Sequence, residues 1–139
     1  MAKSLLKYEK DHGGREKYVR TDRQKDMARD CVIRAIAIAT EQDYKKVMTD
    51  LCRIAVEQCN MPNSRNVYEE YLLNELGWVK HKPYKNSKGK TVEVREFPAE
   101  EGKNYIIHTT SHLTAIKDRV VRDTWWCGEY RANSYYTKD

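Results

Sequence analysis

The residue best placed to do chemistry is Cys31, which follows Asp30 and opens the apolar run from Cys31 to Ala39. Asp30 is a favourable helix N-cap and the run contains no Gly or Pro, so we expect a buried helix that begins at Cys31. Backbone N–H groups and the helix dipole at such a position stabilise a thiolate, the form in which cysteine attacks. The sequence therefore predicts a nucleophilic thiol, with a buried structural cysteine as the alternative.

A histidine and an aspartate further along the chain could complete such a site. His112 directly precedes an apolar segment, and Asp123 ends a second one. A turn around residues 117–119 would join the two segments in a hairpin that pairs position 123 with position 113, beside His112. A carboxylate there can orient the imidazole as a general base, so we expect a Cys-His-Asp triad for nucleophilic acyl transfer.

The stretches that carry these residues resemble a known family, the small phage-encoded papain-like cysteine proteases. They are also similar, more distantly, to the peptidase domains that remove double-glycine leaders in bacteriocin-exporting ABC transporters. The resemblance covers roughly residues 24 to 130, and its motifs are DCVIRAIAIAT (30–40), DYKKV (43–47) and HLTAIKDRVVRDT (112–124).

This resemblance implies a papain-like fold with Cys31 as nucleophile, His112 as general base and then acid, and Asp123 as the group that orients His112. It also implies an oxyanion hole formed by the N–H of Cys31 and by a glutamine upstream of it. Gln24 is the only glutamine shortly upstream. It stands one residue further from the cysteine than in the transporter peptidases.

On this basis we expect a cysteine peptidase or isopeptidase that passes through a thioester and acts on a protein or peptide, in the bacterial host if the chain is phage-encoded. No metal or organic cofactor is implied. Deamidation or transamidation by the same triad is one alternative. Another is a non-catalytic papain-like binding protein that inhibits a host defence component.

Several other residues allow competing interpretations. His108 lies four residues before His112, so on one strand both would face the same way and could hold a metal together with Cys31. Asp118 falls in the predicted turn and is expected to be a turn residue. The aromatic residues near the end of the chain are expected to pack in the core and on the sheet, with a substrate-binding wall as the alternative: Trp125, Trp126, Tyr130, Tyr135 and Tyr136.

The remaining cysteines suggest neither a disulfide framework nor a zinc site. Cys52, Cys59 and Cys127 form no Cys-x-x-Cys pair with one another or with Cys31. In a reducing cytoplasm all four should be free thiols. Cys52 and Cys59 lie seven apart in a helical pattern, and we expect them to be buried structural residues.

The elements that must position the site divide into helices followed by strands. Helices are predicted at residues 31–40, 43–59 and 66–76, and short strands at residues 78–79, 91–97, 105–109, 113–116 and 120–121. This order indicates an α+β domain with N-terminal helices packed on a C-terminal antiparallel sheet. Residues 1–22 are almost all polar and predict an irregular arm or a weakly held edge, followed by a single domain at 23–139.

Composition narrows the class of protein. The 139 residues suit one domain, and the apolar share of 40% suits a folded chain with a wet surface. No apolar run approaches a membrane span and the N-terminus lacks a signal core, so we expect a cytoplasmic protein. The net charge of +5 permits nucleic-acid binding, but the basic residues are scattered among 21 acidic ones, which makes that partner the least favoured.

Overall fold

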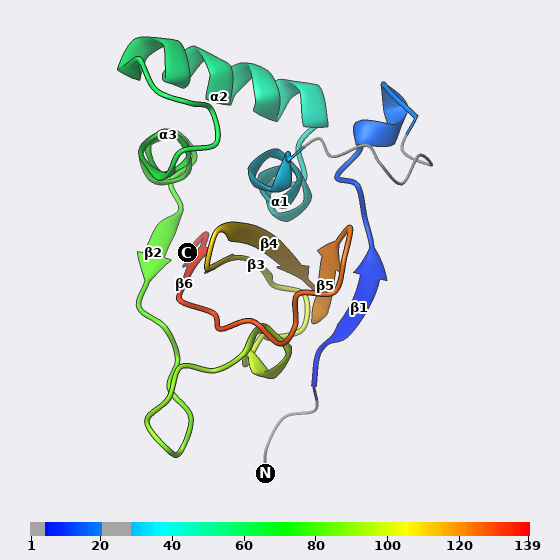
Figure 1. Cartoon of the computed structure of the whole chain (residues 1–139), viewed down its shortest axis with the longest axis vertical. Coiled ribbons are helices and arrows are strands. Elements are labelled where there is room, and N and C mark those ends of the chain that lie inside the picture. The colour runs from blue at the N-terminus through cyan, green and yellow to red at the C-terminus, as the bar shows by residue number, and fades with distance from the viewer. Residues whose placement is uncertain (1–4, 21–28) are drawn as a thin grey trace.

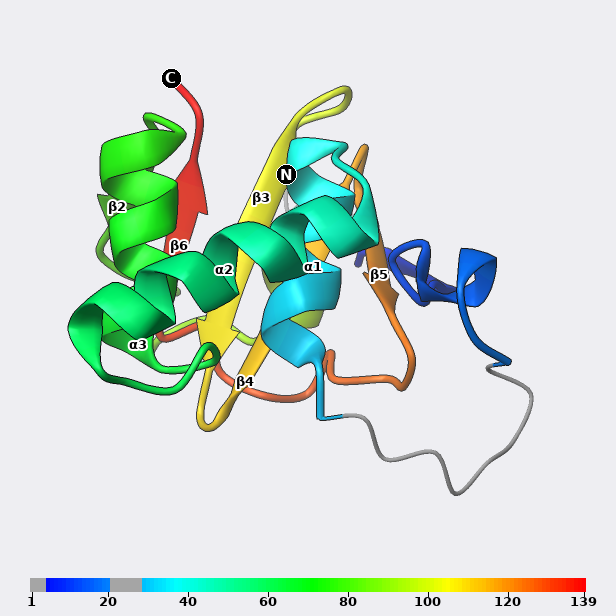
Figure 2. The ribbon, with the colours of Figure 1, turned by 90° about the horizontal axis from the view of Figure 1, so that it is seen from above.

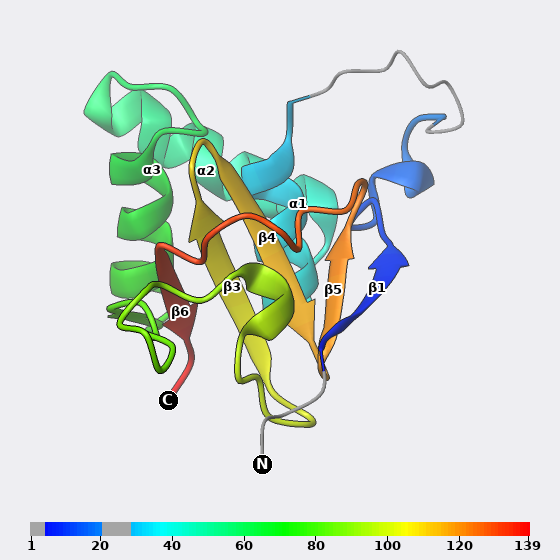
Figure 3. The same ribbon diagram turned by 60° about the horizontal axis from the view of Figure 1, so that its bottom comes forward.

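The computed structural model describes residues 5–20 and 29–139, which form an α+β fold (Figure 1). Three helices pack on one face of a six-stranded sheet, and irregular chain covers the opposite face (Figure 3). No helix among the described residues is long and apolar enough to cross a membrane.

The three predicted helices are present, within a few residues of their expected ends. They are α1 (Cys31–Thr40), α2 (Tyr44–Gln58) and α3 (Arg65–Glu69), and α3 continues as one π-helical segment, η2 (Glu70–Glu75). The side chain of Asp43 caps α2 by accepting hydrogen bonds from the backbone N–H groups of Lys45 and Lys46, at 3.0 and 3.3 Å. From above, α1 and α2 lie over the central strands (Figure 2).

The sheet has the order β1-β5-β4-β3-β6-β2. Its strands are β1 (Lys7–Lys10), β2 (Val79–His81), β3 (Asn104–Thr109), β4 (His112–Lys117), β5 (Val120–Asp123) and β6 (Ser134–Thr137). All neighbouring pairs are antiparallel except β1 and β5, which run parallel. The prediction of an antiparallel sheet is therefore wrong at this edge, where the N-terminal stretch adds a strand and makes the sheet mixed.

The β4–β5 hairpin differs from its predicted register by one residue. Lys117 pairs with Val120, and the two turn residues Asp118 and Arg119 both have positive φ, 50° and 63°. Continuing this register places Asp123 opposite Thr114 rather than Leu113. Because paired residues share a face and successive residues alternate, Asp123 lies on the same face of the hairpin as His112. The predicted register would have put them on opposite faces.

The predicted strand at residues 91–97 is absent. Residues there form the 3-10 turn η3 (Val94–Glu96), closed by a reciprocal pair of hydrogen bonds between Glu93 and Glu96. Two isolated bridges, Lys85 with Thr91 and Glu93 with Arg131, are the only β-pairing of this stretch among the described residues. Its alternating apolar residues are buried, but they pack under the sheet instead of extending it.

Buried apolar residues form two clusters, one on each face of the sheet. The cluster under the helices includes Ile36, Val47, Leu51, Tyr71, Leu72, Ile106 and Tyr136. The cluster on the opposite face includes Leu6, Val94, Phe97, Ile107, Ile116, Val121 and Cys127. Residues near both ends of the chain thus help to fix the hairpin that carries His112 and Asp123.

Candidate active site

Cys31, His112 and Asp123 meet at one end of the sheet. Cys31 is the first residue of α1, His112 the first of β4 and Asp123 the last of β5. Since β4 and β5 are antiparallel neighbours, the start of one lies beside the end of the other. The structure therefore brings together the three residues that were predicted to act jointly.

The environment of Cys31 favours the thiolate. Its side chain lines one pocket together with His112 and Leu113. Burial raises the pKa of the thiol, but the hydrogen bond with His112, together with the charges of His112 and Arg34, outweighs it and leaves the pKa below the usual value. The first N–H groups of α1 add to the stabilisation of an anion there.

His112 and Asp123 are joined by a short hydrogen bond. His112 Nε2 lies 2.6 Å from Asp123 Oδ2, and the side chains are only 9% and 2% exposed. Burial lowers the pKa of His112, but hydrogen bonds with Asp123, Cys127 and Cys31 raise it overall to about 11. The pKa of Asp123 is correspondingly lowered, in spite of its burial. Because Nε2 is bound to Asp123, Nδ1 is the ring nitrogen that remains available to exchange a proton with Cys31.

Buried polar side chains behind the site hold Asp123 in place. Arg34 Nη2 donates to Asp123 Oδ1 at 3.1 Å, and Arg34 Nη1 also binds Asp30. The hydroxyl of Tyr44 donates to the other oxygen of Asp30 at 2.6 Å. Asp30 is therefore less a helix cap than a buried partner of Arg34, and its side chain caps no backbone N–H of α1.

The N-terminal segment binds the backbone of Asp123. The hydroxyl of Tyr8 and the backbone N–H of Asp11 both donate to the Asp123 carbonyl, at 3.1 and 2.9 Å. Gly13, with φ 70°, passes so close to α1 that an added Cβ would lie 3.0 Å from Arg34 Cα. The N-terminal segment therefore contacts both the end of β5 and α1, and it helps to hold them in place.

His108 is not where a shared metal site would need it. A tight turn at Thr110 and Ser111 separates β3 from β4, so His108 and His112 lie on different strands, and His108 pairs with Leu113. Arg65 Nη2 lies 3.4 Å from His108 Nε2. The proposed metal set of Cys31, His108 and His112 is therefore wrong in its geometry.

Cys127 is the neighbour that the sequence did not reveal. It is fully buried, and its Sγ lies 3.6 Å from Asp123 Oδ2. His112, Asp123 and Cys127 offer one ligand atom each within 4.8 Å of one another, which is a donor set that Zn²⁺ accepts. In this structure, however, the histidine and the carboxylate bind each other, and that pairing is the one an acid–base function uses.

The prediction that the five aromatic residues pack in the core is correct for two of them and wrong for Trp125, Trp126 and Tyr130, which are exposed. The ring of Trp125 lies 4.7 Å from that of His112 and is 40% exposed, so it shields the imidazole from one side. Tyr135 and Tyr136 are buried in the sheet, as predicted. Trp126 packs its edge on Tyr8 and contributes to the outer surface.

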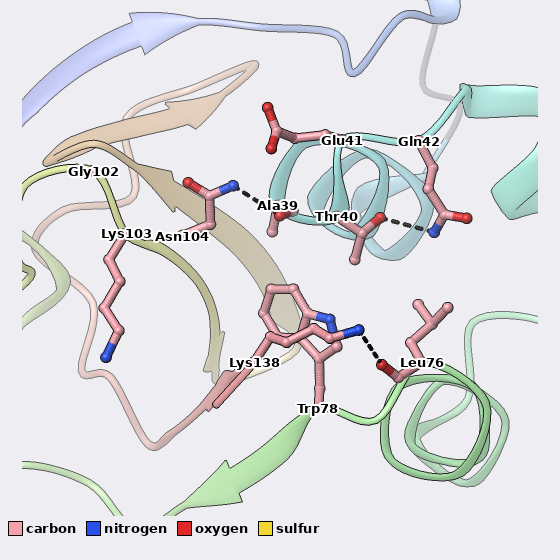
Figure 4. Close-up of a pocket in the computed structure, with 10 residues that line it drawn as sticks. All are labelled: Ala39, Thr40, Glu41, Gln42, Leu76, Trp78, Gly102, Lys103, Asn104 and Lys138. Atoms are coloured by element: carbon pink, nitrogen blue, oxygen red, sulfur yellow. Dashed lines mark hydrogen bonds between the residues drawn. The ribbon is translucent and has the colours of Figure 1, made fainter.

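Two pockets lie at opposite ends of α1. The smaller, about 200 Å³, opens beside the start of the helix and is lined by Cys31, Val32, Asn63, Arg65, Tyr68, His108, Ser111, His112 and Leu113. The larger, about 380 Å³, is at the other end of the helix and contains no member of the triad (Figure 4). There, Asn104 donates to the Ala39 carbonyl and Lys138 to the Leu76 carbonyl. The smaller pocket is the one positioned to receive a substrate.

Other predicted residues have mixed outcomes. Gln24, the expected oxyanion-hole residue, lies outside the described residues. Asp118 is a turn residue, as expected, and accepts a hydrogen bond from the N–H of Gly102. Cys52 and Cys59 are exposed, so the prediction that they are buried is wrong: Cys52 lies on the outer side of α2 and Cys59 ends it in a left-handed conformation.

No protein-family model matches the sequence, and comparisons with curated proteins and with solved structures give no match. The case for a function consequently depends on the site.

Proposed function

We propose that this protein is a papain-like cysteine hydrolase, a peptidase or isopeptidase that acts through Cys31, His112 and Asp123. The observation that carries the proposal is the hydrogen-bonded His112–Asp123 pair, which lies in the same pocket as Cys31 at the start of a helix and lowers the pKa of its thiol. A buried structural cysteine would need neither a histidine of raised pKa beside it nor a carboxylate behind that histidine.

In the first half of the proposed reaction, the Cys31 thiolate attacks the carbonyl carbon of a peptide or isopeptide bond. The negative charge moves to the carbonyl oxygen, where the N–H of Cys31 at the helix start can stabilise it. His112, as the imidazolium, gives its proton to the departing amine as the C–N bond breaks. The products are a free amine and a thioester on Cys31.

In the second half, the now neutral His112 takes a proton from water, whose oxygen attacks the thioester carbonyl. The C–S bond breaks, the acid product leaves, and the thiolate–imidazolium pair is restored. Asp123 remains ionised throughout and fixes the ring so that Nδ1 faces the sulfur. The same steps with a carboxamide as substrate would make the enzyme a deamidase, which is the nearest alternative.

The test is site-resolved alkylation by iodoacetamide from pH 4 to 9, followed by mass spectrometry. Cys52 and Cys59 serve as exposed internal references. Cys31 is expected to react fastest below pH 7, and His112→Ala should remove that advantage, whereas His81→Ala, which alters a histidine on β2, should keep it. If Cys31 reacts no faster than Cys52 at low pH in the parent, the hydrolase proposal fails and a binding role becomes the better hypothesis.

A further inference from the structure

The pocket beside Cys31 has the size of a subsite for one side chain. Its volume of about 200 Å³ is below the roughly 300–1,000 Å³ of sites that hold a drug-sized ligand. Cys31 and His112 form one wall, so a group that enters the pocket lies next to the attacked carbonyl. The chemistry of the other walls should therefore decide which substrates are accepted.

Arg65 is the charged group of those other walls, and neutral partners hold it in place. Its guanidinium donates from Nη2 to His108 Nε2 at 3.4 Å, and the Tyr68 hydroxyl in the same pocket raises the pKa of the guanidinium. Burial lowers the pKa of His108, and the positive charge of Arg65 lowers it further, so that His108 is neutral and accepts this bond. These contacts position the guanidinium without cancelling its charge.

No carboxylate within the described residues forms an ion pair with Arg65 or lines the pocket. The nearest acidic side chain along the helix, Glu69, is bound instead by Lys80 at 2.8 Å and by the Tyr136 hydroxyl at 2.6 Å. A positioned guanidinium with free N–H groups matches the two oxygens of a carboxylate. Asn63 and Ser111 add uncharged polar groups at the rim.

We propose that this pocket binds a carboxylate of the substrate through Arg65, so that the enzyme selects an acidic group close to the bond it cleaves. The inference rests on the proposed hydrolase function and adds its substrate class. The carboxylate can belong to a Glu or Asp side chain or to the free C-terminus of a short peptide, and the experiment separates these sources.

The first arm uses peptidyl vinyl sulfones, which label an active-site thiol covalently. Two pairs of probes differ only by Glu against Gln, placed either next to the electrophile or one residue before it. We expect Cys31 to be labelled about tenfold faster by the Glu member of one pair, equivalent to about 1.4 kcal/mol. Arg65→Gln should abolish the difference, and Arg65→Glu should reverse it in favour of a Lys probe.

The second arm measures how short peptides protect Cys31 from iodoacetamide. A peptide with a free C-terminal carboxylate is compared with its amide, in the parent and in Arg65→Gln. Protection by the acid that depends on Arg65, without a Glu preference in the first arm, assigns the subsite to a terminal carboxylate. A Glu preference without such protection assigns it to a side chain.

Arg53→Gln is the matched control, because Arg53 is an exposed arginine on α2 that pairs with Glu75 away from the pocket. This variant should retain every preference. The unprotected alkylation rate of Cys31 should also stay at the parent value in Arg53→Gln, since Arg53 contributes nothing to the pocket.

The failures of the two proposals are distinguishable. Equal labelling by Glu and Gln probes, with no protection by the free acid, overturns the carboxylate subsite while labelled Cys31 still supports the hydrolase. A charge preference that survives in Arg65→Gln also overturns the subsite. If no probe labels Cys31, both proposals fail.

Discussion

Arg34 and Asp123 are 89 positions apart in the chain, and their side chains meet at 3.1 Å between Nη2 and Oδ1. The contact joins the helix that begins with Cys31 to the strand that carries the carboxylate. Because Asp123 uses its other oxygen for His112, the position of the imidazole is tied directly to α1. Arg34 is thus a positioning residue for the whole site.

Replacing Arg34 by Met should destabilise the protein strongly. The change removes one cation from between Asp30 and Asp123 and leaves two buried carboxylates without it, which typically costs about 3–5 kcal/mol. Urea unfolding measures the loss. Arg53→Met, which breaks an exposed ion pair with Glu75, should destabilise the protein far less, because solvent screens such pairs. Similar losses in the two variants would contradict the assigned role of Arg34.

Asp123→Asn should slow the reaction of Cys31 at pH 6. The amide is neutral, so the pKa of His112 should fall from its raised value and fewer molecules should hold the thiolate–imidazolium pair. The Asn side chain also has only one oxygen acceptor. If that oxygen accepts a hydrogen bond from Arg34, the NH2 group faces His112, and the reverse holds if the amide is flipped. Iodoacetamide rates and an NMR titration of the imidazole check this, and an unchanged histidine titration would refute it.

The free energy of unfolding should fall at both ends of the pH range. The folded pKa of Asp123 is lowered, so its contribution is present above its ordinary value of 3.8 and is lost as the pH falls through the folded value. The folded pKa of His112 is raised to about 11, so its contribution is complete below 6.5 and disappears as the pH rises toward 11. Urea unfolding at several pH values measures this dependence. The free energy of unfolding of His112→Gln should change less between neutral and alkaline pH than that of the parent.

Gly13→Ala should be more destabilising than Gly89→Ala. Both glycines have positive φ, 70° and 75°, so both variants carry backbone strain of about 1 kcal/mol. Only at Gly13 would the new Cβ also press on α1, 3.0 Å from Arg34 Cα, whereas Gly89 faces open space. Thermal unfolding compares the two. Equal decreases in melting temperature would mean that the N-terminal segment moves away from α1 at no additional cost and would contradict the prediction.

Trp125→Ala should reduce the low-pH reactivity of Cys31, and Trp126→Ala should not. Trp125 covers the His112 ring, and without it water would weaken the interactions among His112, Asp123 and Cys31 by raising the local dielectric constant. Trp126 is equally exposed but packs on Tyr8. The ratio of the Cys31 rate to the Cys52 rate at pH 6 reports the effect in each variant, and equal ratios would speak against shielding.

The helices could be predicted from the sequence because their signals are local. The sequence also indicated that Cys31, His112 and Asp123 lie close together, although the predicted hairpin register was wrong by one residue. The apolar run after Asp30 indicated the start of α1, and the apolar spacing indicated α2, although the exposure of Cys52 and Cys59 was not anticipated. Arg34 also carried a signal, since an arginine inside an apolar helix needs a buried acidic partner. The identity of that partner depends on the tertiary fold and could not be read from the spacing.

The rest of the sheet gave weaker signals. All four residues of β1 are exposed, so no apolar alternation marks this strand, and backbone pairing with β5 defines it. The hairpin register depended on whether the turn held two or three residues, and only the left-handed conformations of Asp118 and Arg119 decide that. Cys127 reaches the triad through a loop after β5, which has no periodic pattern.

The parallel pairing of β1 with β5 also bears on the order of events during synthesis. Lys7 pairs with Val120, so this strand has no partner until more than a hundred further residues have been synthesised. Cys31 is likewise made long before His112 and Asp123. The interaction with His112 that lowers the pKa of the Cys31 thiol can therefore form only after the hairpin has been made and has docked against α1. Under the proposed function, the nucleophile would be activated late, as one of the last steps of folding.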